Sequence, residues 1–165
     1  QWQGNVRGWE RPCPTAAAST GGDISMSLDT VRRYGTGQCR LAIVSYGNGV
    51  VTALQARRKL AEENGEQDGW DVIDCPYISR VPDGLRVAIK NYEGVVFADI
   101  CKSSNGILAS MIGILQAEGS LPLAWEIVAA PDTYNPLGSL CTFMNADDIA
   151  QVCRRLAAKA GPTKS

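Results

Sequence analysis

The chain has 165 residues, of which 45% are hydrophobic and 20% are charged, and its formal net charge is −1. These values are typical of one packed globular domain, and they exclude a wholly disordered chain and the basic surface of a nucleic-acid-binding protein. The chain has no histidine, which excludes a histidine general base, a Ser-His-Asp triad and a histidine-ligated zinc site within it.

Residues 1–38 hold six glycines and two prolines and show no sustained periodicity, apart from a short strand or turn expected at 24–31. A coil of this length is uncommon inside a compact domain, so we predict an extended N-terminal arm or interdomain linker. A free tail has little reason to carry two indoles. We therefore expect Trp2, Trp9 and Arg11 to bind a partner chain.

From residue 39 onward, short apolar runs alternate with segments of helical periodicity. In chain order we predict a strand at 41–44, a helix between Asn48 and Gly65, a strand at 70–74, a short helix at 81–91, a strand at 94–100, a helix at 107–115, a strand at 123–128 and a last helix capped by Asn145. No apolar run reaches the roughly 18 residues of a membrane span.

This alternation predicts an α/β fold over residues 39–160, followed by a polar tail at 161–165. The expected architecture is a three-layer α/β/α domain with a mostly parallel sheet of about five strands. Such sheets bind ligands at the carboxyl ends of their strands. In this chain those ends are expected at 45–47, 74–76, 99–102 and 130–132.

The first strand end is a weak candidate for nucleotide binding. Gly47, Asn48 and Gly49 separate a strand from a helix, where the pyrophosphate of a dinucleotide meets a helix N-terminus. Asp74 ends the next strand, in the place of a ribose-binding acid. The fingerprint also requires a small residue where this chain has Thr52, so we favour a tight turn without ligand.

Cysteine usage predicts thiols rather than disulfides. The six cysteines include no C-x-x-C pair and are too sparse for a disulfide scaffold, which favours buried thiols in a reducing compartment and a protein that is not secreted. Cys75 and Cys101 both end strands, so they form a redox pair if those strands are neighbours. Two partly buried free thiols are the favoured interpretation.

Polar residues at the other strand ends have two interpretations. Asp99, Lys102, Asp132 and Thr133 either line a polar cleft or set the shape of the loops by bonding loop amides, which is the commoner role of buried acids. We favour the second, and we expect Asp74→Ala and Asp132→Ala to lower stability rather than activity.

Several segments, in chain order, carry a resemblance to a known family. The most specific are Ile43-Val44-Ser45-Tyr46-Gly47, Val72-Ile73-Asp74 followed by Pro76 and Ser79, and Pro131-Asp132-Thr133 with Pro136-Leu137-Gly138. Together, over about residues 38–160, they resemble the C-terminal domain of the transketolase family. The closest resemblance is to the beta-type portion of thiamine-diphosphate-dependent 2-oxo acid dehydrogenases, the decarboxylating component. One departure is Ile100, where the family usually has an acidic residue.

The resemblance implies a role in assembly. In this family thiamine diphosphate, its magnesium ion and the activating glutamate belong to two other domains, so neither a cofactor nor a catalytic residue is expected in this chain. The C-terminal domain mainly builds subunit interfaces, and in dehydrogenase complexes it helps to dock the acyltransferase core.

We therefore predict a non-catalytic interaction or structural subunit of a larger protein assembly in an organelle, mitochondrion or plastid. Its partners would be other protein subunits, and self-dimerisation stays open. The alternative is a C-terminal fragment of an active thiamine-diphosphate-dependent 2-oxo acid dehydrogenase, of pyruvate or branched-chain type. A small nucleotide-binding module at 47–49 is a third, weaker hypothesis.

Overall fold

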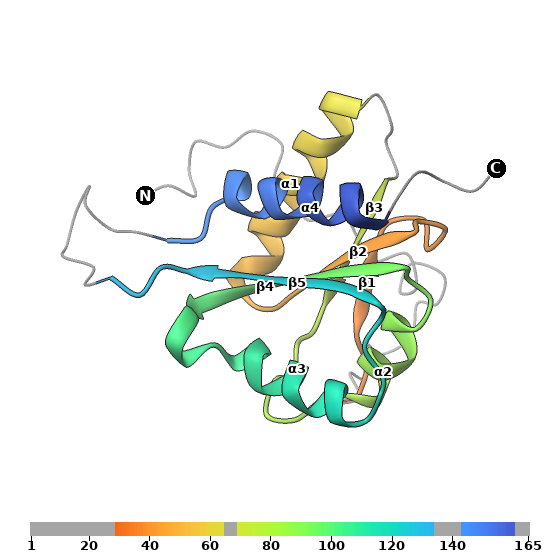
Figure 1. Ribbon diagram of the computed structural model, residues 1–165, viewed down its shortest axis with the longest axis vertical. Helices are drawn as coiled ribbons and strands as arrows, with labels where there is room; N and C mark the ends of the chain where they lie inside the picture. Colours follow the sequence, from red (N-terminus) through yellow and green to blue (C-terminus); the bar gives the residue numbers. More distant parts are fainter. Residues whose placement is uncertain (1–28, 65–68, 134–142, 161–165) are drawn as a thin grey trace, which may run out of the picture.

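The computed structural model describes residues 29–64, 69–133 and 143–160, so Trp2, Trp9 and Arg11 lie outside the described residues. The elements follow the predicted alternation of strands and helices (Figure 1). They are β1 (Arg32–Tyr34), β2 (Leu41–Ser45), α1 (Asn48–Asn64), β3 (Trp70–Asp74), α2 (Asp83–Ile89), β4 (Gly94–Lys102), the 3-10 turn η2 (Ser103–Asn105), α3 (Ile107–Ala117), β5 (Ala124–Ala130) and α4 (Ala146–Ala160).

The strands form one five-stranded sheet in the order β1-β3-β2-β4-β5. The β2, β3, β4 and β5 strands run parallel, and β1 pairs antiparallel with β3. Every residue of β2 and β3 is buried, as expected for parallel strands that helices cover on both faces. The predicted mostly parallel α/β fold is therefore confirmed.

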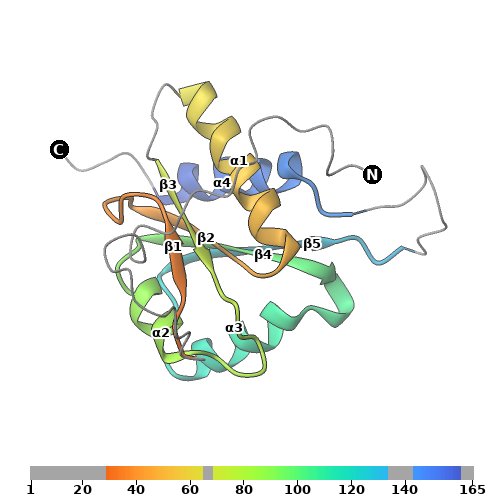
Figure 2. The ribbon, with the colours of Figure 1, turned by 180° about the vertical axis from the view of Figure 1, so that it is seen from behind.

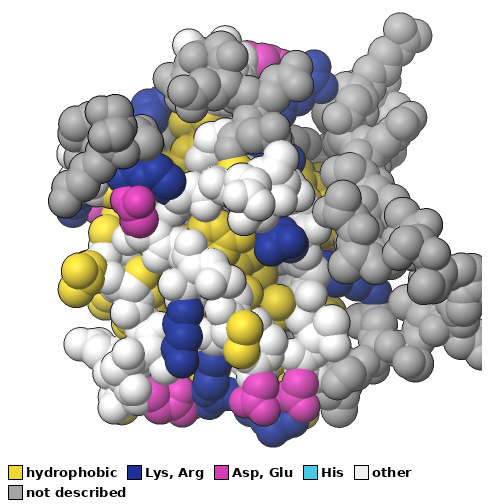
Figure 3. Space-filling model, turned by 90° about the vertical axis from the view of Figure 1, so that its right-hand side faces the viewer, with side chains coloured by type: hydrophobic (Ala, Val, Ile, Leu, Met, Phe, Trp, Pro, Cys, Tyr) yellow, Lys and Arg dark blue, Asp and Glu magenta, His cyan; other side chains and the backbone are white. Residues whose placement is uncertain are grey.

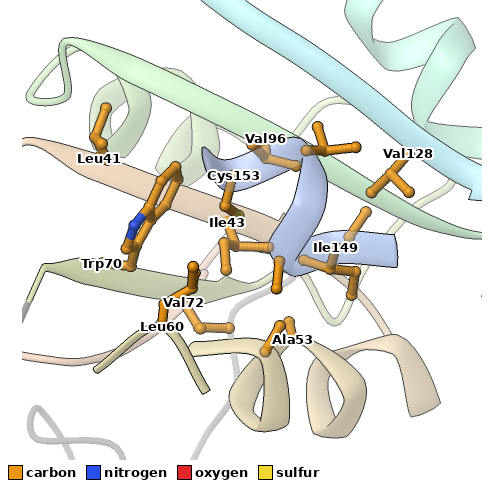
Figure 4. Packing of buried hydrophobic residues seen from close by; sticks show 14 of the residues in the cluster. Leu41, Ile43, Ala53, Leu60, Trp70, Val72, Val96, Val128, Ile149 and Cys153 are labelled. Carbon is orange, nitrogen blue, oxygen red and sulfur yellow. The ribbon is translucent and has the colours of Figure 1, made fainter. Parts of the chain in front are cut away.

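Helices α1 and α4 cover one face of the sheet, and α2 and α3 cover the other (Figures 1 and 2). Each face has its own hydrophobic cluster, because successive side chains of a strand point to opposite faces. In the α1/α4 cluster, side chains of β2, β3 and β4 face those of the two helices (Figure 4). These two clusters define the three layers.

The edge strand β1 lies within the segment that the sequence analysis assigned to an arm. Two of its three residues are arginines, so apolar alternation could not reveal it; Tyr34 alone is buried. Just before β1, the Asp29 carbonyl oxygen accepts a hydrogen bond from the Gly84 N–H at 2.9 Å, and the Asp29 carboxylate binds Arg80 at 2.8 Å. The chain from Asp29 onward therefore packs with the domain.

The last helix starts as the sequence predicts. The Asn145 side-chain oxygen accepts hydrogen bonds from the N–H groups of Asp147 and Asp148 at 2.8 and 3.0 Å. In return, the Asn145 N–H donates to the Asp148 carboxylate at 2.9 Å. This reciprocal cap satisfies N–H groups that the helix itself leaves without partners.

Charged residues on the outer face of α1 connect it to α4. Lys59 binds Asp147, and Glu63 accepts hydrogen bonds from Arg154 at 2.7 to 3.0 Å. Lys59 and Glu63 stand four residues apart, the spacing of an ion pair within one helix, but both bind the neighbouring helix instead. The choice between a partner in the same helix and one in α4 depends on tertiary packing, so sequence spacing alone does not predict it.

Helix α3 carries an isoleucine on its buried face and another on its exposed face, so the same substitution can test the orientation of the helix. We expect Ile112→Ala to lower the free energy of unfolding by about 2–5 kcal/mol, because Ile112 is buried against the sheet. The matched control Ile114→Ala, on the exposed side of the same helix, should cost less than about 1 kcal/mol. Urea denaturation measures both, and equal losses would show that the helix packs in another orientation.

Candidate functional site at the carboxyl ends of the strands

The switch point of this sheet lies between β2 and β4. From β2 the chain crosses to β3 on one side, and from β3 it crosses back to β4 on the other side. Sheets of this class bind ligands in the crevice that this reversal opens at the carboxyl ends of the two strands. The residues that decide what fits there are those at the ends of β2 and β4.

Asp99, near the end of β4, is a fully buried carboxylate with three donors. One oxygen accepts hydrogen bonds from the Tyr46 hydroxyl at 2.7 Å and from the Cys101 N–H at 2.9 Å. The other oxygen accepts from the Leu108 N–H, in the first turn of α3, at 2.7 Å. A carboxylate at this helix N-terminus is favourable because it satisfies a free N–H group and the helix dipole. Asp99 therefore holds β2, β4 and α3 together.

Tyr46 and Ser45, at the end of β2, also form side-chain hydrogen bonds within the chain. Burial, together with the hydrogen bond to Asp99, raises the pKa of Tyr46 well above its usual value, so the phenol stays protonated and keeps donating. The Cys101 sulfur lies 3.2 Å from the same hydroxyl. The Ser45 hydroxyl donates to the Ala98 carbonyl oxygen at 2.8 Å. These contacts join β2 to β4 across the switch point.

The glycine turn that follows β2 is covered by the side chain of Ile100. A Cβ on Gly49 would lie 2.5 Å from the Ile100 Cγ2 atom and 2.4 Å from the Ser45 hydroxyl oxygen. Gly47 has a φ of +53°, and its nearest side-chain neighbour is again Ile100. The close approach that a pyrophosphate needs at such a glycine is occupied by this chain's own side chains.

Asn48 and Asp74, the other two residues of the nucleotide-binding hypothesis, differ in their exposure to solvent. Asn48 is exposed at the start of α1, whereas Asp74 is buried at the end of β3. Asp74 lies beside Ser45 in the β2–β3 register and opposite Arg32 of β1. A tight turn that packs against β4 explains the two glycines without a ligand.

Cys75 and Cys101 do not form a redox pair. Their strands, β3 and β4, are separated by β2, so at about 4.8 Å per strand they stand roughly 9–10 Å apart, beyond the ~7 Å that a disulfide spans. The four described cysteines, Cys39, Cys75, Cys101 and Cys153, are free. Burial raises the pKa of Cys75 to about 12, which leaves it a poor nucleophile at neutral pH.

Asp132, after β5, has a role in loop shape. It accepts hydrogen bonds from the Ser103 hydroxyl at 2.8 Å, the Ser104 hydroxyl at 2.6 Å and the Ser104 N–H at 3.3 Å. These bonds, those of Ser104 foremost, lower the pKa of Asp132. Lys102 donates to the Thr133 carbonyl oxygen at 2.6 Å. These five residues join the end of β4 and η2 to the loop after β5.

One buried carboxylate escaped the sequence analysis. Asp71, in the middle of β3, accepts hydrogen bonds from the Tyr92 hydroxyl at 2.7 Å and the Gly37 N–H at 3.3 Å. Burial and the bond to Asp71 raise the pKa of Tyr92 above its usual value. The only sequence signal for this buried carboxylate was an acidic residue within a mostly apolar strand. Its partners Gly37 and Tyr92 lie in loops 34 and 21 residues away along the chain.

Within residues 29–64, 69–133 and 143–160, no group of three or more Cys, Asp and Glu side chains could hold a metal ion. No described helix is long and apolar enough to cross a membrane. That thiamine diphosphate and magnesium bind elsewhere in an assembly stays a prediction.

Comparison with known proteins supports the fold. Neither a family model nor a curated protein matches the amino-acid sequence. Among solved structures, a chain described as "Split gene transketolase, inactive beta4 tetramer" is similar, with a TM-score of 0.64 and 19% sequence identity. The match covers 81% of this chain and 44% of that one. The fold is therefore transketolase-like, and this chain spans less than half of the neighbour's length.

Two glycines in helices test whether the switch point is filled. Gly113 of α3 has open space where a Cβ would be, so Gly113→Ala should stabilise the protein by up to about 1 kcal/mol. Gly49→Ala should instead cost about 1–3 kcal/mol, because the added Cβ overlaps Ile100 and Ser45. Thermal and urea unfolding measure both variants.

Removing the obstruction provides the control. With Ile100→Ala already in place, Gly49→Ala should cost less than it does in the unaltered chain, because one of the two close contacts is gone. Stabilisation by Gly49→Ala alone would show that the space beside the glycine is open.

Proposed function

We propose that this chain is a non-catalytic structural subunit of a larger protein assembly, built on a transketolase-like domain. One observation carries the proposal: side chains of the chain itself occupy the space beside Gly49, at the switch point between β2 and β4. Ile100 packs on Gly49, and Tyr46 donates to the buried Asp99. Residues committed in this way stabilise the domain and are not free to bind or convert a substrate.

The assembly role rests on the same fold. The transketolase-like neighbour is described as a tetramer, and in the resembling family this domain serves mainly at subunit interfaces. We propose that the segment before Asp29 makes the contact with other subunits through Trp2, Trp9 and Arg11, because indoles and guanidinium groups are the side chains that anchor interfaces most often. An organellar assembly is part of the same proposal.

The alternative is a working piece of a thiamine-diphosphate-dependent 2-oxo acid dehydrogenase. The transketolase-like fold favours it too, since such a domain would contribute dimerisation and docking to the acyltransferase core, while the cofactor lies on other domains or chains. The two functions differ in what accompanies the chain. A dehydrogenase requires a thiamine-binding subunit and a lipoyl acyltransferase core in the same particle.

The composition of the native particle tests this proposal. We expect mild purification from the source cells, followed by native mass spectrometry, to give a complex with other protein subunits but with no thiamine diphosphate and no lipoyl acyltransferase. Co-purification of both would establish the dehydrogenase instead. A chain found alone would contradict both functions.

A truncation then tests the contact. Deletion of residues 1–28 keeps Asp29 and β1, which pack with the domain, so circular dichroism should be unchanged. The truncated chain should no longer enter the complex, and Trp2→Ala with Trp9→Ala should weaken its entry at least tenfold, as expected for interface anchors of roughly 1.4 kcal/mol or more. Unchanged entry of the truncated chain would overturn the role of this segment.

A further inference from the structure

The two edges of the sheet differ in how they are protected. At one edge stands β1, which has only three residues and carries two arginines, features that discourage further strand pairing. At the other edge stands β5, with seven residues and no proline, lysine or arginine. No described strand pairs with the outer side of β5.

The backbone groups on the outer side of β5 can be assigned. A Cβ on Gly94 of β4 would lie 3.5 Å from the Ala124 carbonyl oxygen, so that oxygen points toward β4. Since backbone groups alternate along a strand, Trp125, Ile127 and Ala129 direct their N–H and C=O groups outward. Their side chains lie on the α2/α3 face, where Ile127 is 37% exposed and Trp125 is half-buried.

This edge is complementary to itself. In an antiparallel pair centred on Ile127, the two Ile127 residues stand opposite one another, and Trp125 of each strand stands opposite Ala129 of the other. A large side chain then meets a small one on both sides of the centre. One step beyond β5, the fully exposed Leu123 would lie opposite Pro131. The three hydrogen-bonded pairs would exchange about six backbone hydrogen bonds.

Charges on the opposite face fit the same pairing. Glu126 accepts hydrogen bonds from Arg155 and Lys159 of α4, each at 2.7 Å, and it is therefore neutralised within its own chain. Both cations are half exposed and have donors to spare. In the pair centred on Ile127, the two Glu126 side chains lie diagonally across the junction, so the cations of each copy face the carboxylate of the other.

The covering helices also leave room for a second copy. Helix α4 packs over both β4 and β5, so it lies inside the edge of the sheet and not beyond it. With their axes midway between these two strands, two such helices across the junction would stand roughly 9–10 Å apart, the usual distance between packed helices.

We propose that a second copy of this chain pairs with the outer edge of β5, antiparallel and centred on Ile127, to form a continuous ten-stranded sheet. The apolar groove of about 690 Å³ beside Leu123 and Trp125 lies at the amino ends of β4 and β5, next to this junction. Figure 3 shows the hydrophobic side chains that gather on that face of the molecule. This pairing goes beyond the proposed function, because it needs no other subunit.

Sedimentation equilibrium of the purified 165-residue chain tests the proposal. The unaltered chain should have twice the mass of one chain, and Ile127→Lys should have the mass of one chain, because two ammonium groups would meet at the centre of the junction. Val87→Lys is the matched control, since Val87 is an exposed apolar residue on α2, and it should stay dimeric. A single-chain mass for the unaltered protein, or a dimer of Ile127→Lys, would overturn the proposal.

Engineered cysteines test the register, and they do so without depending on the stability of Ile127→Lys. Opposed residues at the centre stand about 5.5 Å apart between Cα atoms, within disulfide range, whereas the two Ala129 residues would be about 14 Å apart. Under mild oxidation Ile127→Cys should cross-link into dimers. The fraction of cross-linked dimer formed by Ala129→Cys should not exceed that of the unaltered chain. Cross-linking of Ala129→Cys alone, or of neither variant, would refute this pairing. None of these outcomes depends on hetero-subunits, so they are independent of the truncation experiment.

Discussion

The structure depends on how the carboxylate of Asp99 is kept buried. A buried charge is tolerated only with a full set of partners, and Asp99 finds them in the Tyr46 hydroxyl, the Cys101 N–H and the Leu108 N–H. The β4 strand changes its register against β5 between Asp99 and Lys102, which frees the backbone of Cys101 to turn toward the carboxylate. One side chain thus sets the end of two central strands and the start of α3.

The hydrogen bond between Tyr46 and Asp99 also affects which parts of the sheet are available to bind other molecules. Tyr46 is bound to Asp99, and Ile100 packs on Gly49, so side chains of the chain itself occupy the space beside this glycine at the switch point. Among the described residues, no strand pairs with the outer side of β5, and Ile127 on this strand is 37% exposed. This arrangement supports the proposal that the chain contacts other chains through the edge of its sheet.

The sequence revealed the architecture because its signals were local. The buried parallel strands β2 and β3 were visible as short, mostly apolar runs, although Asp71 and Asp74 interrupt β3. Asn145 was visible as a cap because its partners lie two and three residues away. Strand β1 was not visible, because its pairing with β3, not its own pattern, makes it a strand.

The site could be located but not interpreted. Strand ends followed from the pattern, yet strand order did not, and only the order shows that β2 separates Cys75 from Cys101. The same limit applied to Asp99: a cleft carboxylate and a structural one look alike until Leu108 and Tyr46 are seen to donate to it. Contacts between residues 9 and 53 positions apart are tertiary facts, which no local periodicity contains.

The most direct test of the filled switch point is the stability of Asp99→Asn, with Tyr46→Phe and the double variant, in urea at neutral pH. The amide of the asparagine would direct its NH₂ group at one of the donors that now bind the carboxylate. The account predicts a loss of about 1–3 kcal/mol for Asp99→Asn, and a double variant that loses less than the sum of the two single losses. An Asp99→Asn protein as stable as the unaltered chain would contradict it, and would mean that this carboxylate is kept for a purpose other than holding the fold.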